Sequence, residues 1–364
     1  MEHPENDDLY KGLKVNKGVA DVPTVNPYLK KRIQRKEYTP AEFVEGILKG
    51  NITILSQAVT LVESSKYEHQ QVAQEIIEKC LPHAGKSVRI GITGVPGAGK
   101  STSIDAFGMH LIGQGRKLAV LAIDPSSERS KGSILGDKTR MEALSREKNA
   151  FIRPSPSAGS LGGVARKTRE TIVLCEAAGF DTVFVETVGV GQSETAVHSM
   201  VDFFLLIQLA GTGDELQGIK RGIMEMADLM VITKADGENI HKAELAKTQF
   251  QSALQLFPLP ESEWRPRVYT CSAVSGAGLE EVWKGVEEFL DHTQGNGFFR
   301  HNRNRQNKYW MYETIDETLK NSFYRDPRIE AEISVLEGQV LDGKISSFIA
   351  AKRLLDLYFG GKAE

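Results

Sequence analysis

GVPGAGKST, residues 94–102, is the stretch that decides the fold of this chain. It matches the pattern G-x-x-x-x-G-K-[ST] at every defined position. The apolar run VRIGIT (88–93) precedes it and a helical pattern over 100–113 follows, which is the strand–loop–helix context that the pattern requires. The stretch therefore predicts a phosphate-binding loop between a buried strand and a helix.

The residue types in this loop suit a nucleoside triphosphate. Glycines let the backbone curl so that its N–H groups face phosphate oxygens, and the following helix adds the positive end of its dipole. We expect Lys100 to reach the β- and γ-phosphates and the Ser101 hydroxyl to bind Mg²⁺. The predicted nucleotide-binding residues of the loop are Gly94, Val95, Pro96, Gly97, Ala98, Gly99, Lys100, Ser101 and Thr102.

Further apolar runs have the length of buried strands: 118–124, 182–186, 203–209, 229–233 and 268–272. Helical patterns such as 163–178 lie between them. Apolar strands that alternate with helices predict an α/β fold, here a P-loop NTPase core with a mostly parallel central sheet covered on both faces. Ligands of such sheets bind at the carboxyl ends of the strands, so polar residues at those ends are the candidates for the site.

Acidic residues at these ends are candidates for holding the metal. Asp124 follows LAVLAI, Glu186 follows TVFV, and Asp137 lies within ILGDKTRM. The predicted metal-site residues are Ser101, Asp124, Asp137 and Glu186, since a phosphate loop needs carboxylates nearby to hold Mg²⁺.

Glu186-Thr187-Val188-Gly189 has the form of the D-x-x-G element with Glu in place of Asp. In that element the glycine N–H senses the γ-phosphate, and its loss relaxes the loop. Gln192 follows in the same loop and is a candidate for orienting water. The predicted catalytic residues are Lys100, Glu186, Asp137 and Gln192.

MVITKADG, residues 230–237, indicates which base is bound. Guanine presents two adjacent donors that suit the Asp236 carboxylate, whereas the N1 lone pair of adenine would repel it. The stem of Lys234 is expected to lie along the base while its ammonium stays in water. Ser272 and Ala273, at the next strand end, match the S-A element whose backbone N–H meets the guanine carbonyl. Together these residues predict GTP.

Helical patterns flank the core on both sides. The first begins at Thr39-Pro40-Ala41-Glu42, a capping sequence, and continues to Pro82. The last starts near residue 300 and carries two apolar stripes, Tyr309, Tyr312, Ile315, Leu319 and Phe323, then Ile329, Ile333, Leu336 and Val340, before a final helix near Ser346. These stripes either pack on the core or form a dimer interface. We expect a tail and helical extension at 1–85, a P-loop GTPase domain at 86–295 and a helical dimerisation arm at 296–364.

Bulk properties limit the function class. The net charge of the 364-residue chain is −3, so no general attraction to nucleic acid or anionic membrane is expected. The three cysteines, Cys80, Cys175 and Cys271, are scattered, which suits a reducing compartment. The polar N-terminus has no apolar signal segment. These features predict a cytoplasmic protein.

LAIDPSS (121–127), GDKTRM (136–141), ETVGVGQSE (186–194) and AGTGDELQGIKRGIMEMAD (210–228) resemble motifs of the methylmalonyl-CoA mutase-associated GTPases. This family is also called the ArgK/MeaB type and belongs to the SIMIBI class of P-loop G proteins. The resemblance runs from residue 40 to the C-terminus.

The resemblance implies a homodimeric, Mg²⁺-dependent GTPase that escorts an adenosylcobalamin-dependent methylmalonyl-CoA mutase. Such a chaperone gates cofactor loading by a cob(I)alamin adenosyltransferase and protects the mutase. The resemblance places Asp214, Gln217 and Lys220 in a third switch that couples nucleotide state to the partner. Thr233 departs from the family, which has Asn there, and a hydroxyl in place of an amide is expected to tether the phosphate loop less strongly.

Three other functions remain open. The first is an ATP- or GTP-dependent kinase of a lysine/arginine/ornithine transport system, although the chain shows no evident acceptor site. The second is a metal-delivery GTPase, although clusters of soft or imidazole ligands are not evident among the dispersed histidines and cysteines. The third is a scaffold that binds GTP without hydrolysing it.

Overall fold

The computed structural model describes residues 38–124, 141–156, 161–187, 193–210 and 221–360. The chain divides into two units, Met1–Thr39 and Pro40–Glu364. All that follows concerns the second unit. The predicted domain limits at residues 85 and 295 fall before the first strand and at the end of α10, and they remain a prediction.

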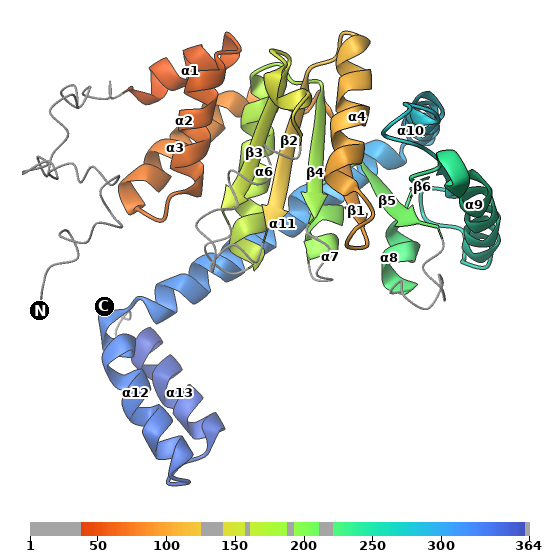
Figure 1. The fold of residues 1–364 in the computed structure, drawn as a ribbon. Helices are drawn as coiled ribbons and strands as arrows, with labels where there is room; N and C mark the ends of the chain where they lie inside the picture. Colours follow the sequence, from red (N-terminus) through yellow and green to blue (C-terminus); the bar gives the residue numbers. More distant parts are fainter. Residues whose placement is uncertain (1–37, 125–140, 157–160, 188–192, 211–220, 361–364) are drawn as a thin grey trace, which may run out of the picture. The chain divides into compact units, whose positions relative to one another are not determined.

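The predicted α/β fold is confirmed. The described residues form a seven-stranded sheet in the order β3-β2-β4-β1-β5-β6-β7, and the recorded neighbouring pairs are parallel (Figure 1). The strands are β1 (Val88–Gly94), β2 (Leu118–Asp124), β3 (Ala150–Pro156), β4 (Thr182–Thr187), β5 (Phe203–Leu209), β6 (Leu229–Thr233) and β7 (Arg267–Thr270). Because β1 lies at the centre, the phosphate loop that follows it is flanked by the ends of β4 and β5.

Strand β3 was not among the predicted strands. Its sequence, AFIRPSP, carries Arg153 and two prolines, which are poor strand formers. Proline cannot donate to a sheet ladder, and it is therefore tolerated mainly on edge strands. β3 is the edge of this sheet and pairs with β2 on one side, so its location explains its composition.

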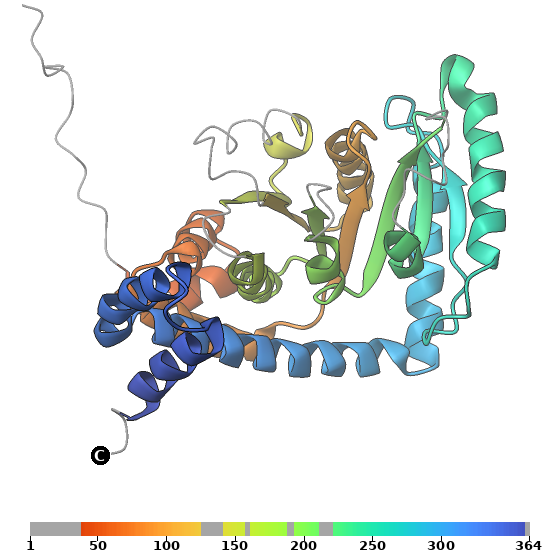
Figure 2. The same cartoon turned by 90° about the horizontal axis from the view of Figure 1, so that it is seen from below.

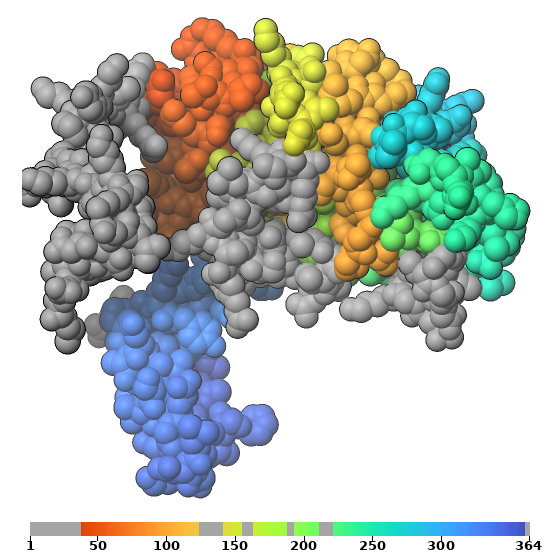
Figure 3. All heavy atoms as spheres, in the orientation of Figure 1, coloured from red at the N-terminus to blue at the C-terminus, as the bar shows by residue number. Residues whose placement is uncertain are grey.

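Helices cover both faces of the sheet. They are α4 (Lys100–Gly113), α6 (Leu161–Ala177), α7 (Ser193–His198), α8 (Arg221–Met226), α9 (Ile240–Gln255), α10 (Leu279–Gly295) and α11 (Phe298–Tyr324). Under α4 and α10, Phe107 stacks on Phe184 and meets Trp283 edge-on. In Figure 3 the atoms of α4, in orange, adjoin those of α10, in cyan. This aromatic core holds the start of α4, and with it the phosphate loop, against the sheet.

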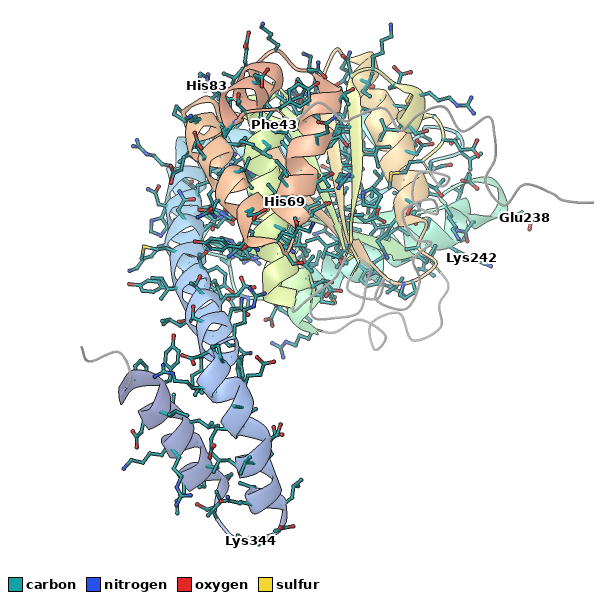
Figure 4. The ribbon with its side chains drawn as sticks, turned by 90° about the vertical axis from the view of Figure 1, so that its left-hand side faces the viewer. Phe43, His69, His83, Glu238, Lys242 and Lys344 are labelled. Atoms are coloured by element: carbon teal, nitrogen blue, oxygen red, sulfur yellow. The ribbon has the colours of Figure 1, made fainter. Side chains whose placement is uncertain are left out.

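The N-terminal helical pattern is confirmed as three helices, α1 (Pro40–Leu48), α2 (Ile52–Glu63) and α3 (Tyr67–Cys80). The chain turns between α1 and α2 at Gly50, whose φ is +71°, and the Asn51 side chain accepts hydrogen bonds from the first turn of α2. Phe43 is buried in this layer, while His69 starts α3 and His83 follows its end (Figure 4).

The C-terminal pattern is confirmed as the second half of α11, then α12 (Pro327–Leu341) and α13 (Ser347–Gly360). Figure 2 shows α11 running beside the sheet from α10 toward α12 and α13. Ile329, Leu336, Ala350, Leu354 and Tyr358 form a core between α12 and α13. The α11 stripe behaves differently, since Tyr309, Tyr312, Ile315 and Leu319 are 45–56% exposed. Among the described residues, no helix is long and apolar enough to cross a membrane.

Candidate nucleotide-binding site

The phosphate loop connects β1 to α4, as predicted. Gly97 and Gly99 have φ of +80° and +77°, in the left-handed region that favours glycine. Gly94 is required for a different reason, because a Cβ there would lie 2.3 Å from the carbonyl oxygen of Ile207 on β5. The loop can therefore curl tightly against the sheet only with this sequence.

Lys100 begins α4 and folds back over the loop. Its ammonium donates to the Gly94 carbonyl at 2.8 Å. Burial lowers the pKa of Lys100 below its ordinary value, while the charges of Glu186 and Glu194 oppose that shift. Both carboxylates are buried, since Glu186 and Glu194 are 8% and 2% exposed, and their charges favour the protonated form of Lys100.

Ser101 and Glu186 meet beside the loop. The Ser101 hydroxyl donates to Oε1 of Glu186 at 3.2 Å. The next residue, Thr187, donates its hydroxyl to that of Thr93 at 2.8 Å and so links the ends of β4 and β1. A serine hydroxyl and a carboxylate are oxygen donors of the kind that Mg²⁺ prefers, and these two side chains fit a Mg²⁺ ion held beside phosphate oxygens.

The other metal and switch candidates are less fully described. Asp124 ends β2, and its strand pairs with β4 so that Ala122 lies opposite Glu186. The backbone of Asp124 therefore lies where predicted, at the carboxyl ends of the strands. Outside the described residues lie Asp137, Gly189, Gln192, Asp214, Gln217 and Lys220, whose assignments remain predictions.

The segment predicted to recognise the base lies at the end of β6. Lys234 adopts a left-handed φ of +57°, which is costly for a residue with a side chain. Its Cε atom passes 3.8 Å from the position that a Cβ on Gly99 would take. Lys234 therefore crosses the phosphate loop before the chain reaches Asp236.

Asp236 is held by the loop after β7. The Ser272 hydroxyl donates to Oδ2 of Asp236, and the Val274 and Ser275 amides donate to that hydroxyl at 3.2 and 3.1 Å. The Ser272 amide itself donates to the Ala277 carbonyl at 2.9 Å. Ser272 thus orients the carboxylate, and of the predicted S-A pair it is the Ala273 amide that suits contact with a base.

Thr233 joins the two halves of the site. Its hydroxyl, 2% exposed, lies 2.7 Å from the Ala98 carbonyl of the phosphate loop and 3.0 Å from the Gln208 carbonyl of β5. The single proton is shared between these two acceptors. The weaker tether expected from the missing amide is therefore offset by a direct hydrogen bond from the Thr233 hydroxyl to the phosphate loop.

Two polar residues of the site were not among the predicted site residues. Glu194 starts α7 and is buried where its charge acts on Lys100. Gln208 is 3% exposed on β5, and its Nε2 is buried without a hydrogen-bond partner among the described residues. A lone polar residue inside the apolar run FFLLIQL was the signal that could have identified Gln208.

Comparisons with known proteins agree with this geometry. The family described as "Methylmalonyl Co-A mutase-associated GTPase MeaB" matches residues 55–328. A probable GTPase of Mycobacterium tuberculosis (strain H37Rv) is 49% identical over 308 residues, covering 85% of this chain and 92% of that protein. The mouse mitochondrial "Methylmalonic aciduria type A homolog" is 47% identical over 323 residues, covering 86% of this chain and 78% of that protein.

A solved structure has the same fold. The crystal structure of a "LAO/AO transport system kinase" is 38% identical and superposes with a TM-score of 0.69, covering 89% of this chain and 98% of that one.

Proposed function

This chain belongs to the methylmalonyl-CoA mutase-associated GTPase family, and we propose that it uses its GTPase activity to assist an adenosylcobalamin-dependent methylmalonyl-CoA mutase. GTP and Mg²⁺ are its proposed ligands. In this proposal the protein is a chaperone that gates cofactor loading of the mutase and protects it. The family description and the name of the mouse relative support the mutase as partner.

One observation gives the main support for GTP as the bound nucleotide. The strand end that carries Asp236 is hydrogen-bonded through Thr233 to the phosphate loop, and the Asp236 carboxylate is oriented by Ser272. A base-reading acceptor and a phosphate cradle are thus parts of one connected structure. Since the carboxylate suits the two donors of guanine and repels the N1 lone pair of adenine, this arrangement favours GTP over ATP.

The described residues have separate tasks in this proposal. Backbone amides of Gly97–Lys100 surround phosphate oxygens, and Lys100 neutralises charge on the β- and γ-phosphates. Ser101 and Glu186 would hold the Mg²⁺ ion, which would supply neutralisation of phosphate charge when bound. Asp236 and the Ala273 amide hold the guanine. Catalysis of phosphoryl transfer by such sites rests on positioning and electrostatic stabilisation.

Nucleotide selectivity is tested by calorimetry on the wild type and Asp236→Asn. We expect the wild type to bind GTP about 100-fold or more tightly than ATP, and Asp236→Asn to lose about 10- to 100-fold in GTP affinity, as a charged hydrogen bond is worth. Asp291→Asn, on the exposed side of α10, is the matched control and should bind GTP normally. Equal binding of GTP and ATP by the wild type would contradict the guanine assignment.

The chaperone role is tested by retention of a cobalamin mutase on the immobilised protein. Retention should depend on whether GDP or a slowly hydrolysed GTP analogue is bound, because the switch loops respond to the γ-phosphate. Mutase should also accelerate GTP turnover. If the mutase is not retained in the presence of any nucleotide and does not stimulate turnover, the protein remains a GTPase but serves another partner.

A transport-system kinase is the second candidate, because the similar solved structure carries that description. It predicts transfer of the γ-phosphate to a protein side chain. Incubation with radiolabelled GTP or ATP separates the two functions, since a kinase leaves a stable phosphoprotein and a GTPase releases inorganic phosphate. The homodimer, the adenosyltransferase link and the cytoplasmic location stay predictions.

A further inference from the structure

A cleft of about 610 Å³ lies between α3, α6 and α11. It includes Gly85 and Arg89 at the start of β1, which is the opposite end of that strand from the phosphate loop. Its wall combines apolar and basic side chains. The apolar side includes Leu81, Val173, Trp310, Met311 and Ile315, and the basic side consists of Arg89, Arg166, Arg169 and Arg303. Glu170 also lines the cleft and lies beside Arg166.

Two of these arginines are fully engaged in ion pairs. Arg89 makes a bidentate contact with Glu176 at 2.8 and 3.0 Å. Arg303 donates to Asp202 at 2.7 and 2.6 Å and also to the Gly85 and Ser87 carbonyls. Nε of Arg166 is buried without a hydrogen-bond partner among the described residues, but Arg166 forms ion pairs with Glu170 at 3.5 Å and Glu317 at 3.8 Å. Carboxylates of the chain itself therefore balance these three cations.

Arg169 differs from the other three. It donates to the Asn307 side chain and lies 5.9 Å from the Trp310 ring, but no ion pair with a carboxylate is found for it among the described residues. Its Nη1 is buried and has no hydrogen-bond partner among them. Burial and the neighbouring charges of Arg89 and Arg303 lower the pKa of Arg169 to about 10, while the charges of Glu176 and Asp202 oppose that shift. The guanidinium is therefore still charged at neutral pH.

A partly buried guanidinium without an ion pair of its own is costly, and buried donor atoms without a hydrogen bond are rare in native proteins. The planar fork of arginine suits the two oxygens of a carboxylate or the oxygens of a phosphate. We propose that this cleft binds a small organic anion, a carboxylate or phosphate ester on an apolar body, with Arg169 and Asn307 at its charged end and Trp310, Met311 and Ile315 along its body.

The occupant would touch both α6 and α11. α6 follows the edge strand β3, and α11 leads to α12 and α13. A ligand at their junction would therefore tie the C-terminal helices more firmly to the nucleotide-binding core. This site is independent of the proposed mutase role, and neither result decides the other.

The test uses the full chain saturated with GDP and Mg²⁺, so that the phosphate loop cannot take up the probes. Benzoate, phenyl phosphate and neutral benzyl alcohol are titrated separately by calorimetry. We expect saturable binding of one or both anions and at least about 10-fold weaker binding of benzyl alcohol, since charge supplies the recognition. The tighter of the two anions identifies carboxylate or phosphate as the preferred group.

Arg169→Met should weaken binding of the preferred anion about 10-fold or more, because it removes the charged fork. Arg305→Met is the matched control. It removes the same charge from α11, another helix of the cleft wall, but its side chain is 49% exposed and pairs with Glu261, so binding should not change. Arg169→Lys keeps the charge but lacks the planar guanidinium group. It is measured as well, in case Arg169→Met does not fold.

Three results would overturn the proposal. The first is no saturable binding of either anion, and the second is equal binding of benzyl alcohol. The third is an unchanged affinity in whichever of Arg169→Met and Arg169→Lys is folded, as judged by circular dichroism. In those cases the buried cation serves only the packing of α6 on α11.

Discussion

Thr233 connects parts of the nucleotide site that lie 135 residues apart in the chain. The hydroxyl is fully inside the protein, and it reaches both the phosphate loop and the neighbouring strand β5. An asparagine at this position would offer an amide with both a donor and an acceptor. A threonine offers one donated proton, and here the Ala98 carbonyl of the loop is the nearer of its two acceptors. The consequence for nucleotide affinity can be measured.

Thr233→Val replaces the hydroxyl with a methyl group of similar size. It leaves the Ala98 carbonyl without this donor and lets the loop move, so GTP affinity should fall about 5-fold, the worth of one net hydrogen bond. Thr233→Ser keeps the hydroxyl and should bind within about 2-fold of the wild type. Calorimetric titration with GTP measures all three proteins. Identical GTP affinities of Thr233→Val and the wild type would show that the tether does not support nucleotide binding.

At the scale of elements, the amino ends of β1 and β5 are fastened to α6 and α11 by buried ions. Arg89 of β1 pairs with Glu176 of α6, and Arg303 of α11 pairs with Asp202 just before β5. Burial alone would raise the pKa of Glu176, but hydrogen bonds from Arg89, Ser87 and the Gly85 amide lower it below its ordinary value of 4.5. The ionised form is therefore the one that stabilises the fold.

Glu176→Gln should lower the free energy of unfolding at neutral pH by about 3–5 kcal/mol, because Arg89 then stays buried without its counter-ion. The folded-state pKa is depressed, so the stabilisation is complete above pH 4.5 and is lost as the pH falls through the folded-state pKa. The difference between wild type and variant should accordingly shrink in acid.

Urea unfolding from pH 3 to pH 7 measures this difference. Glu75→Gln breaks only a half-exposed pair with Lys79 and should change stability by less than about 1 kcal/mol. A wild-type-like stability of Glu176→Gln at pH 7 would contradict the role of the pair.

At the scale of the whole molecule, the C-terminal helices leave much apolar surface exposed. The inner faces of α12 and α13 cover one another, while Leu341 and Phe348 are 87% and 86% exposed. The Tyr309–Leu319 stripe of α11 adds further apolar area. Exposed apolar patches of this kind mark interaction surfaces, and a second copy of the chain is the partner that the family resemblance implies.

Phe348→Ser should weaken a dimer of this chain about 10-fold or more, the effect of truncating a buried aromatic anchor. Leu256→Ser is the matched control, because Leu256 is also 87% exposed but lies at the end of α9. Sedimentation velocity over a range of concentrations gives the association constants. A wild type that stays monomeric throughout would refute the dimer.

Some features of the molecule were predicted from the sequence and others were not. The phosphate loop, the strands around it and the helical flanks follow from local patterns, and the structure confirms them. The edge strand β3 escaped prediction because its prolines are acceptable only at an edge, and edges are defined by strand order. The last helix begins near Ser346 as predicted, and packing against α12 decides that Leu354 and Tyr358 are among its buried residues.

By itself the sequence determined the chemistry that short segments encode: a loop with the phosphate-binding pattern, an acid near the end of β4 and a carboxylate suited to guanine. Such motifs need only neighbouring residues, since backbone curvature and strand ends are local properties. Tertiary structure alone decided that Thr233 reaches Ala98, that Ser272 orients Asp236, and that Nη1 of Arg169 has no hydrogen-bond partner among the described residues. These features depend on which strands and helices become neighbours, and that is settled by packing across the whole sheet.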